Sequence, residues 1–441
     1  MNASMTRYSL WAVVLSICLM LSFIAISYPV PTISIAAVFM FGTILLASLK
    51  ITKGELYERS IRILLAITII QQSVVISGVN ISFSDVYLIA AFIGLIILNP
   101  KIAKLPKAYL TFSMSYIAYC LMSFAWSSNP SESIVPFVQY VEFMFIGVIV
   151  FYNMRTSEHI TKAIKWYVYS SALLGIIAVL MAFKQGYSGP LYILGFHKNA
   201  LGAVVGNAIP MIIGLRLMKG KSKLLLVCLA LCTLTLFLSQ SRGAMIGSVV
   251  GVCCLFILVG KSRKVISFII SGAVALYLFV TFFAPSYIEK LTRFDSSSSA
   301  YSRVIIYNDV IRKIKEHVWL GGGLGTYQIW IPQINFRQDD PNNVFLLNLV
   351  EIGVIGLVLF VLLCLYIFNA ALRNKKLFKY NKEYLILSAI CFSGFISQLS
   401  HIQVDVSWLR GTGLFTFGCV GMMLALRRIP RNSESTKDAS V

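Results

Sequence analysis

Three ionisable residues, Glu142, Arg242 and Glu351, lie inside apolar runs that are long enough to cross a membrane. A charged side chain at that depth is costly, so it marks a site or a specific partner. Arg242 belongs to the segment SQSRGA, in which the hydroxyl of Ser241 and a guanidinium lie beside a glycine. A guanidinium binds phosphate oxygens through two parallel hydrogen bonds, so this segment predicts a phosphate-binding turn. The alternative is an Arg that only extends to the membrane surface.

Two further polar groups stand where apolar runs begin. One consists of His197, Lys198 and Asn199, which we interpret as substrate-binding residues; the alternative is an interfacial His beside a Lys that extends to water. The other group precedes the run that contains Glu351, and its members are Asp340, Asn342 and Asn343.

Glu351 lies eight residues after Asn343. This spacing corresponds to a depth of roughly 12 Å along a helix. We expect the Glu351 carboxylate to form a structural ion pair with an arginine such as Arg242.

The composition indicates the fold class of the protein that carries these residues. Of 441 residues, 58% are hydrophobic and only 12% are charged, and the mean hydropathy is +0.81. Soluble domains contain about 25% charged residues, so these values exclude a soluble enzyme, a disordered protein and a nucleic-acid binder despite a net charge of +21. The apolar runs predict an all-α polytopic membrane protein of about 12–14 transmembrane helices. Their approximate ranges are 8–27, 30–49, 61–79, 83–99, 109–126, 135–153, 166–184, 199–218, 224–239, 242–260, 265–284, 344–370, 384–401 and 409–426.

The distribution of positive charge predicts the orientation in the membrane. Most of the 38 Lys and Arg residues fall in short segments between alternate apolar runs, and such segments face the cytoplasm. This places both termini in the cytoplasm. The predicted regions are transmembrane helices 1–11 at 1–284, a long outer loop at 285–343, helices 12–14 at 344–426 and a cytoplasmic tail at 427–441. Other ionisable residues at or near the outer surface are Asp85, His401, Asp405 and Arg410.

The long loop contains one stretch, 301–318, with the periodicity of an amphipathic helix. We expect this helix to lie on the membrane surface or to roof a cavity, and the alternative is a solvated cap. Its predicted end is the glycine run at 321–323. Its apolar face is predicted at Val304, Ile305, Val310, Ile311 and Ile314, and its basic face at Arg303, Arg312, Lys313 and Lys315. Aromatic residues that could stack on sugars include Tyr307, and the alternative is anchoring at the membrane interface.

Four segments, in this order over about 195–360, resemble the O-antigen ligase and polymerase superfamily, which contains Wzy-type polymerases, O-antigen ligases and exopolysaccharide polymerases. The first segment, GFHKNALG at 195–202, is most similar to the exopolysaccharide polymerase branch. The others are SRGA at 241–244, the loop segment from Arg303 to GGLGTY at 322–327, and the segment from Asn342 to Leu357. The amino-terminal half matches by hydropathy alone.

The resemblance implies a reaction at the periplasmic face of the bacterial inner membrane. The donor would be an oligosaccharide on undecaprenyl pyrophosphate, and a hydroxyl of an acceptor glycan lipid would attack its anomeric carbon. Arg242, Arg303 and Lys198 would stabilise the departing pyrophosphate. No metal site and no cofactor are expected, and membrane lipid and a chain-length regulator are the expected further partners.

The superfamily commonly has His-Asn where this chain has Asn342 and Asn343. Because Asn has no titratable nitrogen, it cannot be a general base, and this difference favours a polymerase of lipid-linked repeat units over an O-antigen ligase. The candidates for a base are Asp340, Asp339, His197 and Glu142.

A transporter or flippase of lipid-linked sugars is the alternative of another class. Transporters typically contain internal repeats and carry charged residues at the membrane midplane, whereas this sequence shows neither. The enzyme interpretation requires Arg242 and Arg303 to converge, and it fails if they point to separate places with no shared hollow that a lipid tail could enter.

Overall fold

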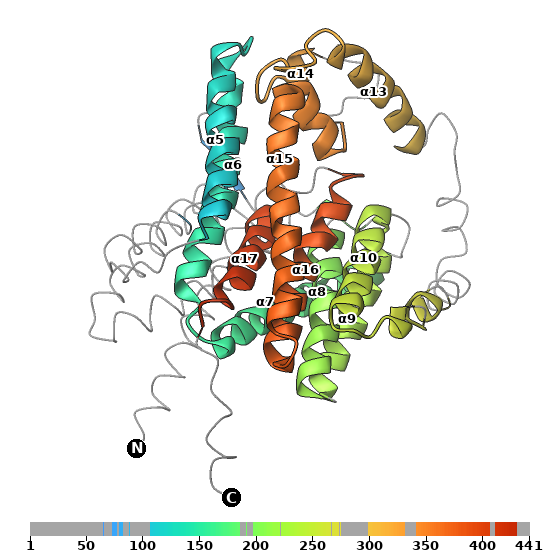
Figure 1. The fold of residues 1–441 in the computed structure, drawn as a ribbon. Coiled ribbons are helices and arrows are strands. Elements are labelled where there is room, and N and C mark those ends of the chain that lie inside the picture. Colours follow the sequence, from blue (N-terminus) through green and yellow to red (C-terminus); the bar gives the residue numbers. More distant parts are fainter. Residues whose placement is uncertain are drawn as a thin grey trace, which may run out of the picture.

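The computed structural model describes residues 65, 73–76, 79–82, 88, 106–185, 191, 197–220, 222–265, 267–272, 274, 299–330, 341–405 and 411–429. Almost all of this part of the chain is helical (Figure 1). The helices are α5 (Lys107–Met122), the short 3-10 helix η1 (Ser123–Ala125), α6 (Pro130–Asn153), α7 (Ser157–Gln185), α8 (Lys198–Lys219), α9 (Lys223–Ser239), α10 (Arg242–Leu258), α13 (Ser299–Ile314), α14 (Tyr327–Trp330), α15 (Val344–Leu377), α16 (Lys382–His401) and α17 (Gly411–Ala425).

The predicted class, an all-α polytopic membrane protein, is confirmed. Six of the described helices, namely α5 to α8, α15 and α16, are long and apolar enough to cross a membrane, and α9, α10 and α17 are shorter apolar helices. Their bounds agree with the predicted apolar runs within a few residues, except that α6, α7 and α15 extend further at one end. The predicted spans at 8–27 and 30–49 lie outside the described residues, as does most of those at 83–99 and 265–284.

A short antiparallel hairpin corrects one predicted span. Strands β1 (Ser73–Ile76) and β2 (Val79–Ser82) pair with Ser73 opposite Ser82 and Ile76 opposite Val79. The end of the predicted helix at 61–79 is therefore extended. The β-branched residues of this segment favour the extended backbone, and hydropathy alone does not distinguish an apolar strand from an apolar helix.

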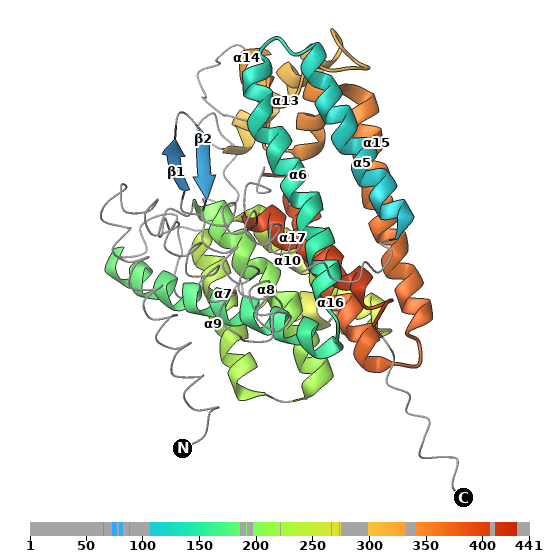
Figure 2. The same cartoon turned by 90° about the vertical axis from the view of Figure 1, so that its left-hand side faces the viewer.

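Small residues allow the helices around α10 to approach closely. Helix α10 packs on α8 and α16, and α17 packs on α16 and α6 (Figures 1 and 2). A Cβ added to Gly247 of α10 would lie 2.5 Å from the carbonyl oxygen of Ser397 in α16, so only a residue without a side chain fits there. Close approach of this kind is the usual means of packing helices in a bilayer.

Helix α15 is broken at Gly353, and part of the long loop is attached to this break. Gly353 has a φ of 65°, in the left-handed region, so the helical path is interrupted there. Four backbone hydrogen bonds join the break to residues 318–323, which we call the glycine segment. Val354 N donates to Val318 O at 2.9 Å, and Ile355 N to Trp319 O at 3.4 Å. In the other direction Gly322 N donates to Val350 O at 3.0 Å, and Gly323 N to Glu351 O at 2.8 Å.

The other side of the glycine segment lies against the connection between α5 and α6. The indole Nε1 of Trp126 donates to Leu320 O at 3.0 Å. The hydroxyl of Ser133 donates to Leu324 O at 2.6 Å, and Leu324 N donates to the hydroxyl of Ser123 at 3.3 Å. The segment is thus fixed between two transmembrane elements. It holds α13 and α14 at one end of the bundle, which we call the loop end (Figure 1).

Candidate functional site

Helix α13 is oriented by the residues that it buries. Ile306 and Val310 are buried against Val350 of α15 and against Tyr327. The predicted apolar face is partly wrong, because Val304 and Ile311 are 46% and 49% exposed. The sequence supports two overlapping apolar stripes on this helix, and packing against α15 selects the one that contains Ile306.

This rotation brings Arg303 to the inner face of α13 and corrects its predicted position on the basic face. Ile306 and Val310 follow Arg303 by three and seven residues, so the three side chains lie on one side of the helix. The Nε atom of Arg303 is buried and has no hydrogen-bond partner among the described residues. A guanidinium nitrogen withdrawn from water without an acceptor is costly, so this site is suited to an anion.

Lys198, at the start of α8, lies near the other two basic residues predicted for the site, Arg242 and Arg303. Electrostatic interactions link it to Arg242, Arg303 and Asp405. The three cations, Lys198, Arg242 and Arg303, thus lie near one another although they come from α8, α10 and α13; we call them the cation cluster. Lys198 is thus within electrostatic range of both arginines, and the convergence of Arg242 and Arg303 on one hollow stays a prediction.

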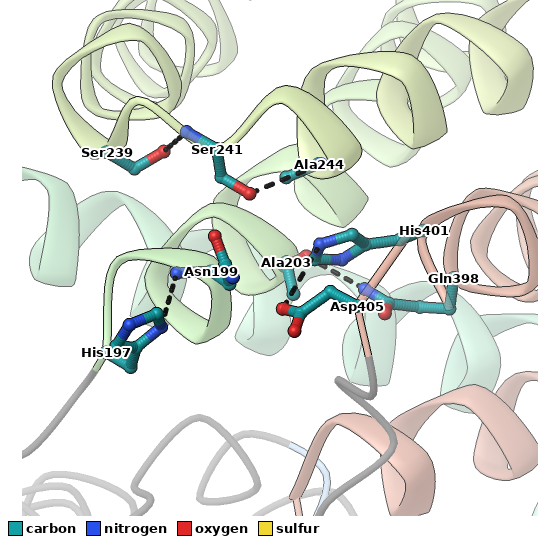
Figure 3. A network of polar contacts seen from close by, with 9 residues as sticks. All are labelled: His197, Asn199, Ala203, Ser239, Ser241, Ala244, Gln398, His401 and Asp405. Atoms are coloured by element: carbon teal, nitrogen blue, oxygen red, sulfur yellow. Dashed lines mark hydrogen bonds and ion pairs between the residues drawn. The ribbon is translucent and has the colours of Figure 1, made fainter. Parts of the chain in front are cut away.

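The residue before Lys198 begins the helix. His197 is the N-cap of α8, and its Nδ1 accepts a hydrogen bond from Asn199 N at 3.4 Å (Figure 3). Burial, and next the charge of Lys198, lower the pKa of His197. A neutral imidazole is the form that can accept the backbone N–H, so this shift is consistent with the cap.

Ser241 shapes the turn that presents Arg242. It is buried, its hydroxyl accepts a hydrogen bond from Ala244 N at 3.4 Å as the N-cap of α10, and Ser241 N donates to the hydroxyl of Ser239 at 3.3 Å (Figure 3). Gly243 makes room for a side chain, because a Cβ there would lie 2.6 Å from Cδ2 of His401.

His401 and Asp405 form a pair that the site predicted from sequence did not include. His401 ends α16, and its Nε2 lies 3.9 Å from Oδ2 of Asp405 (Figure 3). Electrostatic interactions link Asp405 to Lys198, and Arg303 to His401. A His and an Asp four residues apart, at the end of an apolar run, were the available sequence signal. Only the packing of α16 against α10 shows that this end faces the cation cluster.

Asn343 has a structural function. Its Oδ1 accepts hydrogen bonds from Phe345 N at 2.9 Å and Leu346 N at 3.1 Å, which makes it the N-cap of α15. Its Nδ2 donates to Gln403 O at 3.0 Å. Asn342, just before it, has a φ of 53° in the left-handed region, a conformation that Asn tolerates better than most residues.

Glu351 is buried beneath the glycine segment. Its Oε1 accepts a hydrogen bond from Tyr327 N, the first residue of α14, at 3.2 Å. The carboxylate therefore caps a helix of the loop. The predicted ion pair with Arg242 stays a prediction.

Two further predicted residues, Glu142 and Tyr307, lie on α6 and α13. Glu142 lies in α6, which packs mainly on α17 and α5, and Tyr307 packs beside Ile306 and Val310. Asp339 and Asp340 lie outside the described residues. Within the described part of the chain, no three His, Cys, Asp or Glu residues are arranged to share a metal ion.

Comparison with known proteins finds similarity over part of the chain. A family model described as O-antigen ligase matches residues 227–361, which include Arg242, Arg303 and Glu351. An O-antigen ligase of Pseudomonas aeruginosa is 24% identical over 295 residues, which cover 64% of this chain and 70% of that protein. Lys198, His401 and Asp405 lie outside the residues that the family model matches.

Proposed function

We propose that this chain is a member of the O-antigen ligase and polymerase superfamily, which it resembles over part of its length, and that it polymerises lipid-linked polysaccharide repeat units. The donor is a glycan on undecaprenyl pyrophosphate, and the acceptor is a sugar hydroxyl of a second glycan lipid. The reaction takes place at the periplasmic face of the bacterial inner membrane, with both termini in the cytoplasm. The observation that supports this proposal is that Lys198 lies within electrostatic range of both Arg242 and Arg303, and that Arg303 has a buried nitrogen without an acceptor among the described residues.

The cation cluster has the charge that a departing diphosphate requires. As the bond between the anomeric carbon and the phosphate oxygen breaks, negative charge develops on the diphosphate. Fixed cations stabilise that charge more in the transition state than in the bound donor, and this difference accelerates transfer. Because side chains supply the positive charge, the proposed reaction needs no metal ion.

Two observations bear on the choice between polymerase and ligase. Asn342 stands where the superfamily commonly has a His, and this favours the polymerase. The name of the similar Pseudomonas aeruginosa protein, O-antigen ligase, favours transfer to a lipid A core as the second candidate function. A regulator of chain length is expected as a partner only of the polymerase.

A glycan ladder from a deletion strain tests the proposal. We expect cores capped by a single repeat unit, because single units still form and are transferred without polymerisation. Polymer that accumulates on the lipid carrier would instead indicate a missing ligase. Single units that remain on the cytoplasmic face would indicate a flippase and contradict both enzyme assignments.

Complementation of that strain tests the cation cluster. We expect Arg242→Ala to abolish long chains while the protein level and single lipid-linked units stay unchanged. The matched control is Arg263→Ala, which removes an exposed arginine beyond the other end of α10. Chains of normal length in the Arg242→Ala strain would contradict the proposed role.

A further inference from the structure

The turn that ends α16 brings a carboxylate and an imidazole to the cation cluster. His401 and Asp405 are four residues apart, and their side chains are 2% and 17% exposed. The carboxylate is therefore the accessible member of the pair, whereas the imidazole is enclosed by protein. In Figure 3 both side chains point into the space between α8 and α16, toward each other.

Hydrogen bonds join this turn to the segment in which the superfamily commonly has its histidine. Val344 N donates to Ile402 O at 3.0 Å, and Asn343 Nδ2 donates to Gln403 O at 3.0 Å. The backbone of the 402–403 turn thus contacts the two residues that follow Asn342. A side chain on this turn therefore lies near Asn342. Because Asn342 has no titratable nitrogen and cannot act as a base, a base in this region must come from another residue.

We propose that Asp405 is the general base that accepts the proton of the acceptor hydroxyl, and that His401 is a positioning residue for it. This inference rests on the proposed function and names a catalytic residue for it. In the proposed step, the acceptor oxygen gives its proton to the Asp405 carboxylate and forms a bond to the anomeric carbon. The bond from that carbon to the phosphate oxygen breaks, and its electron pair leaves with the diphosphate. The proton then passes from Asp405 to water.

The surroundings of the two residues explain the division of roles. Asp405 interacts electrostatically with Lys198, so the base stands beside the groups that hold the leaving diphosphate. His401 is buried against Gly243, the neighbour of Arg242. The separation of 3.9 Å between Nε2 and Oδ2 is too long for a hydrogen bond. Such contacts often shorten only when substrate binds.

The candidates predicted from sequence are placed differently. Nδ1 of His197 already accepts the N–H of Asn199, and Glu142 lies on α6, which packs mainly on α17 and α5. Asp340 is outside the described residues, so Asp340→Asn belongs in the same assay as a comparison.

The test uses the full-length protein in liposomes with a lipid-linked donor and an acceptor glycan lipid. We expect Asp405→Asn to lower kcat by about 10²–10⁴-fold, the range typical of a lost general base. The KM for the donor and the binding of undecaprenyl pyrophosphate should change less than about threefold, because the cation cluster stays intact. Asp405→Glu should recover part of kcat. The control is Glu383→Gln, which replaces an exposed carboxylate at the other end of α16.

Three outcomes would overturn the assignment. One is a normal kcat in Asp405→Asn. Another is a change confined to the donor KM, which would make Asp405 only a counter-ion of Lys198. The third is loss of pyrophosphate binding and of thermal stability together, which would indicate a structural role. Absence of transfer by the wild-type protein would instead contradict the proposed function itself, so the two failures are distinguishable.

His401 is tested by two substitutions. His401→Phe keeps a ring against Gly243 but removes the nitrogens, and His401→Gln keeps a polar nitrogen. A positioning role predicts that Phe lowers kcat by about tenfold at an unchanged donor KM and that Gln retains more activity. Equal activity of the Phe variant and the wild type would show that the imidazole only fills space.

Discussion

Arg303 is the residue whose surroundings most directly indicate a bound anion, because its Nε is buried without an acceptor among the described residues. Arg312 lies on the same helix and forms an exposed ion pair with Asp309 at 3.1 Å. The two arginines therefore allow a comparison, on one helix, of a guanidinium with a buried nitrogen and an exposed one.

We expect Arg303→Ala to lower the transfer rate by about 10²–10³-fold, the usual effect of losing one group that stabilises developing charge. Arg303→Lys should recover only part of the rate, since an ammonium cannot bind a phosphate with two parallel hydrogen bonds. Arg312→Ala should transfer normally, because exposed ion pairs contribute little. Glycan transfer by purified variants measures this, and equal effects at the two positions would contradict the assignment.

Glu351 offers a second test at this scale, because its Oε1 accepts the backbone N–H of Tyr327. Glu351→Gln keeps an oxygen for that N–H, so we expect stability close to that of the wild type. Glu351→Ala leaves a buried donor unpaired, at a cost of about 1–3 kcal/mol. Thermal unfolding in detergent compares the two variants. If Gln destabilises as much as Ala, the negative charge matters, which would support the predicted ion pair with Arg242.

At the scale of elements, the break in α15 determines where α13 lies. Gly353 and Gly321 both have positive φ values, and a Cβ on either one would overlap the backbone of the other segment. The contact between the glycine segment and α15 is therefore a close approach of two main chains.

We expect Gly353→Ala to release the glycine segment, because the added Cβ would overlap the carbonyl of Trp319. The control is Gly220→Ala, which has a φ of 80° but no atom within 4 Å of the added Cβ. Both variants carry a backbone strain of roughly 1–3 kcal/mol, because both glycines combine a positive φ with an extended ψ. Only Gly353→Ala should increase proteolysis within 299–330 and reduce transfer. Equal behaviour of the two would mean that strain, and not the contact, is what matters.

Much of this arrangement follows from the sequence, and particular residues show where such inference ends. The apolar runs predict the helices well because a membrane-spanning helix is specified by length and hydropathy. The apolar run after Asn343 predicts one unbroken helix with close packing at Gly353. Hydropathy does not reveal the break at Gly353, because it carries no information about a loop segment that bonds to the helix backbone there. The amphipathic pattern of 301–318 predicts a helix but not which stripe is buried, since that depends on α15.

The site shows the same division between local and long-range information. Lys198, Arg242 and Arg303 are predicted from residue type and from the resemblance, and their proximity depends on three elements that are far apart in sequence. His401 and Asp405 join them only because α16 packs on α10. A pairing of that kind cannot be inferred from the spacing within one helix.

At the scale of the whole molecule, the cation cluster and the described part of the loop share the loop end of the bundle. The distribution of Lys and Arg predicts that this end faces the periplasm. A reporter active only in the periplasm should therefore be active when inserted at 296–299 and inactive when fused after residue 441. A reporter active only in the cytoplasm should give the opposite result. Activity of the periplasmic reporter at the carboxyl terminus would contradict the predicted topology.

The bonds between the glycine segment and α15 join peptide groups, not side chains. Peptide groups are the same in every non-proline residue, so the attachment depends little on which side chains the rest of the loop carries. Exposed residues of α13 can therefore be exchanged while Arg303 keeps its place. Under the proposed function, swapping that surface between related proteins is a route to altered glycan selectivity that leaves the cation cluster unchanged.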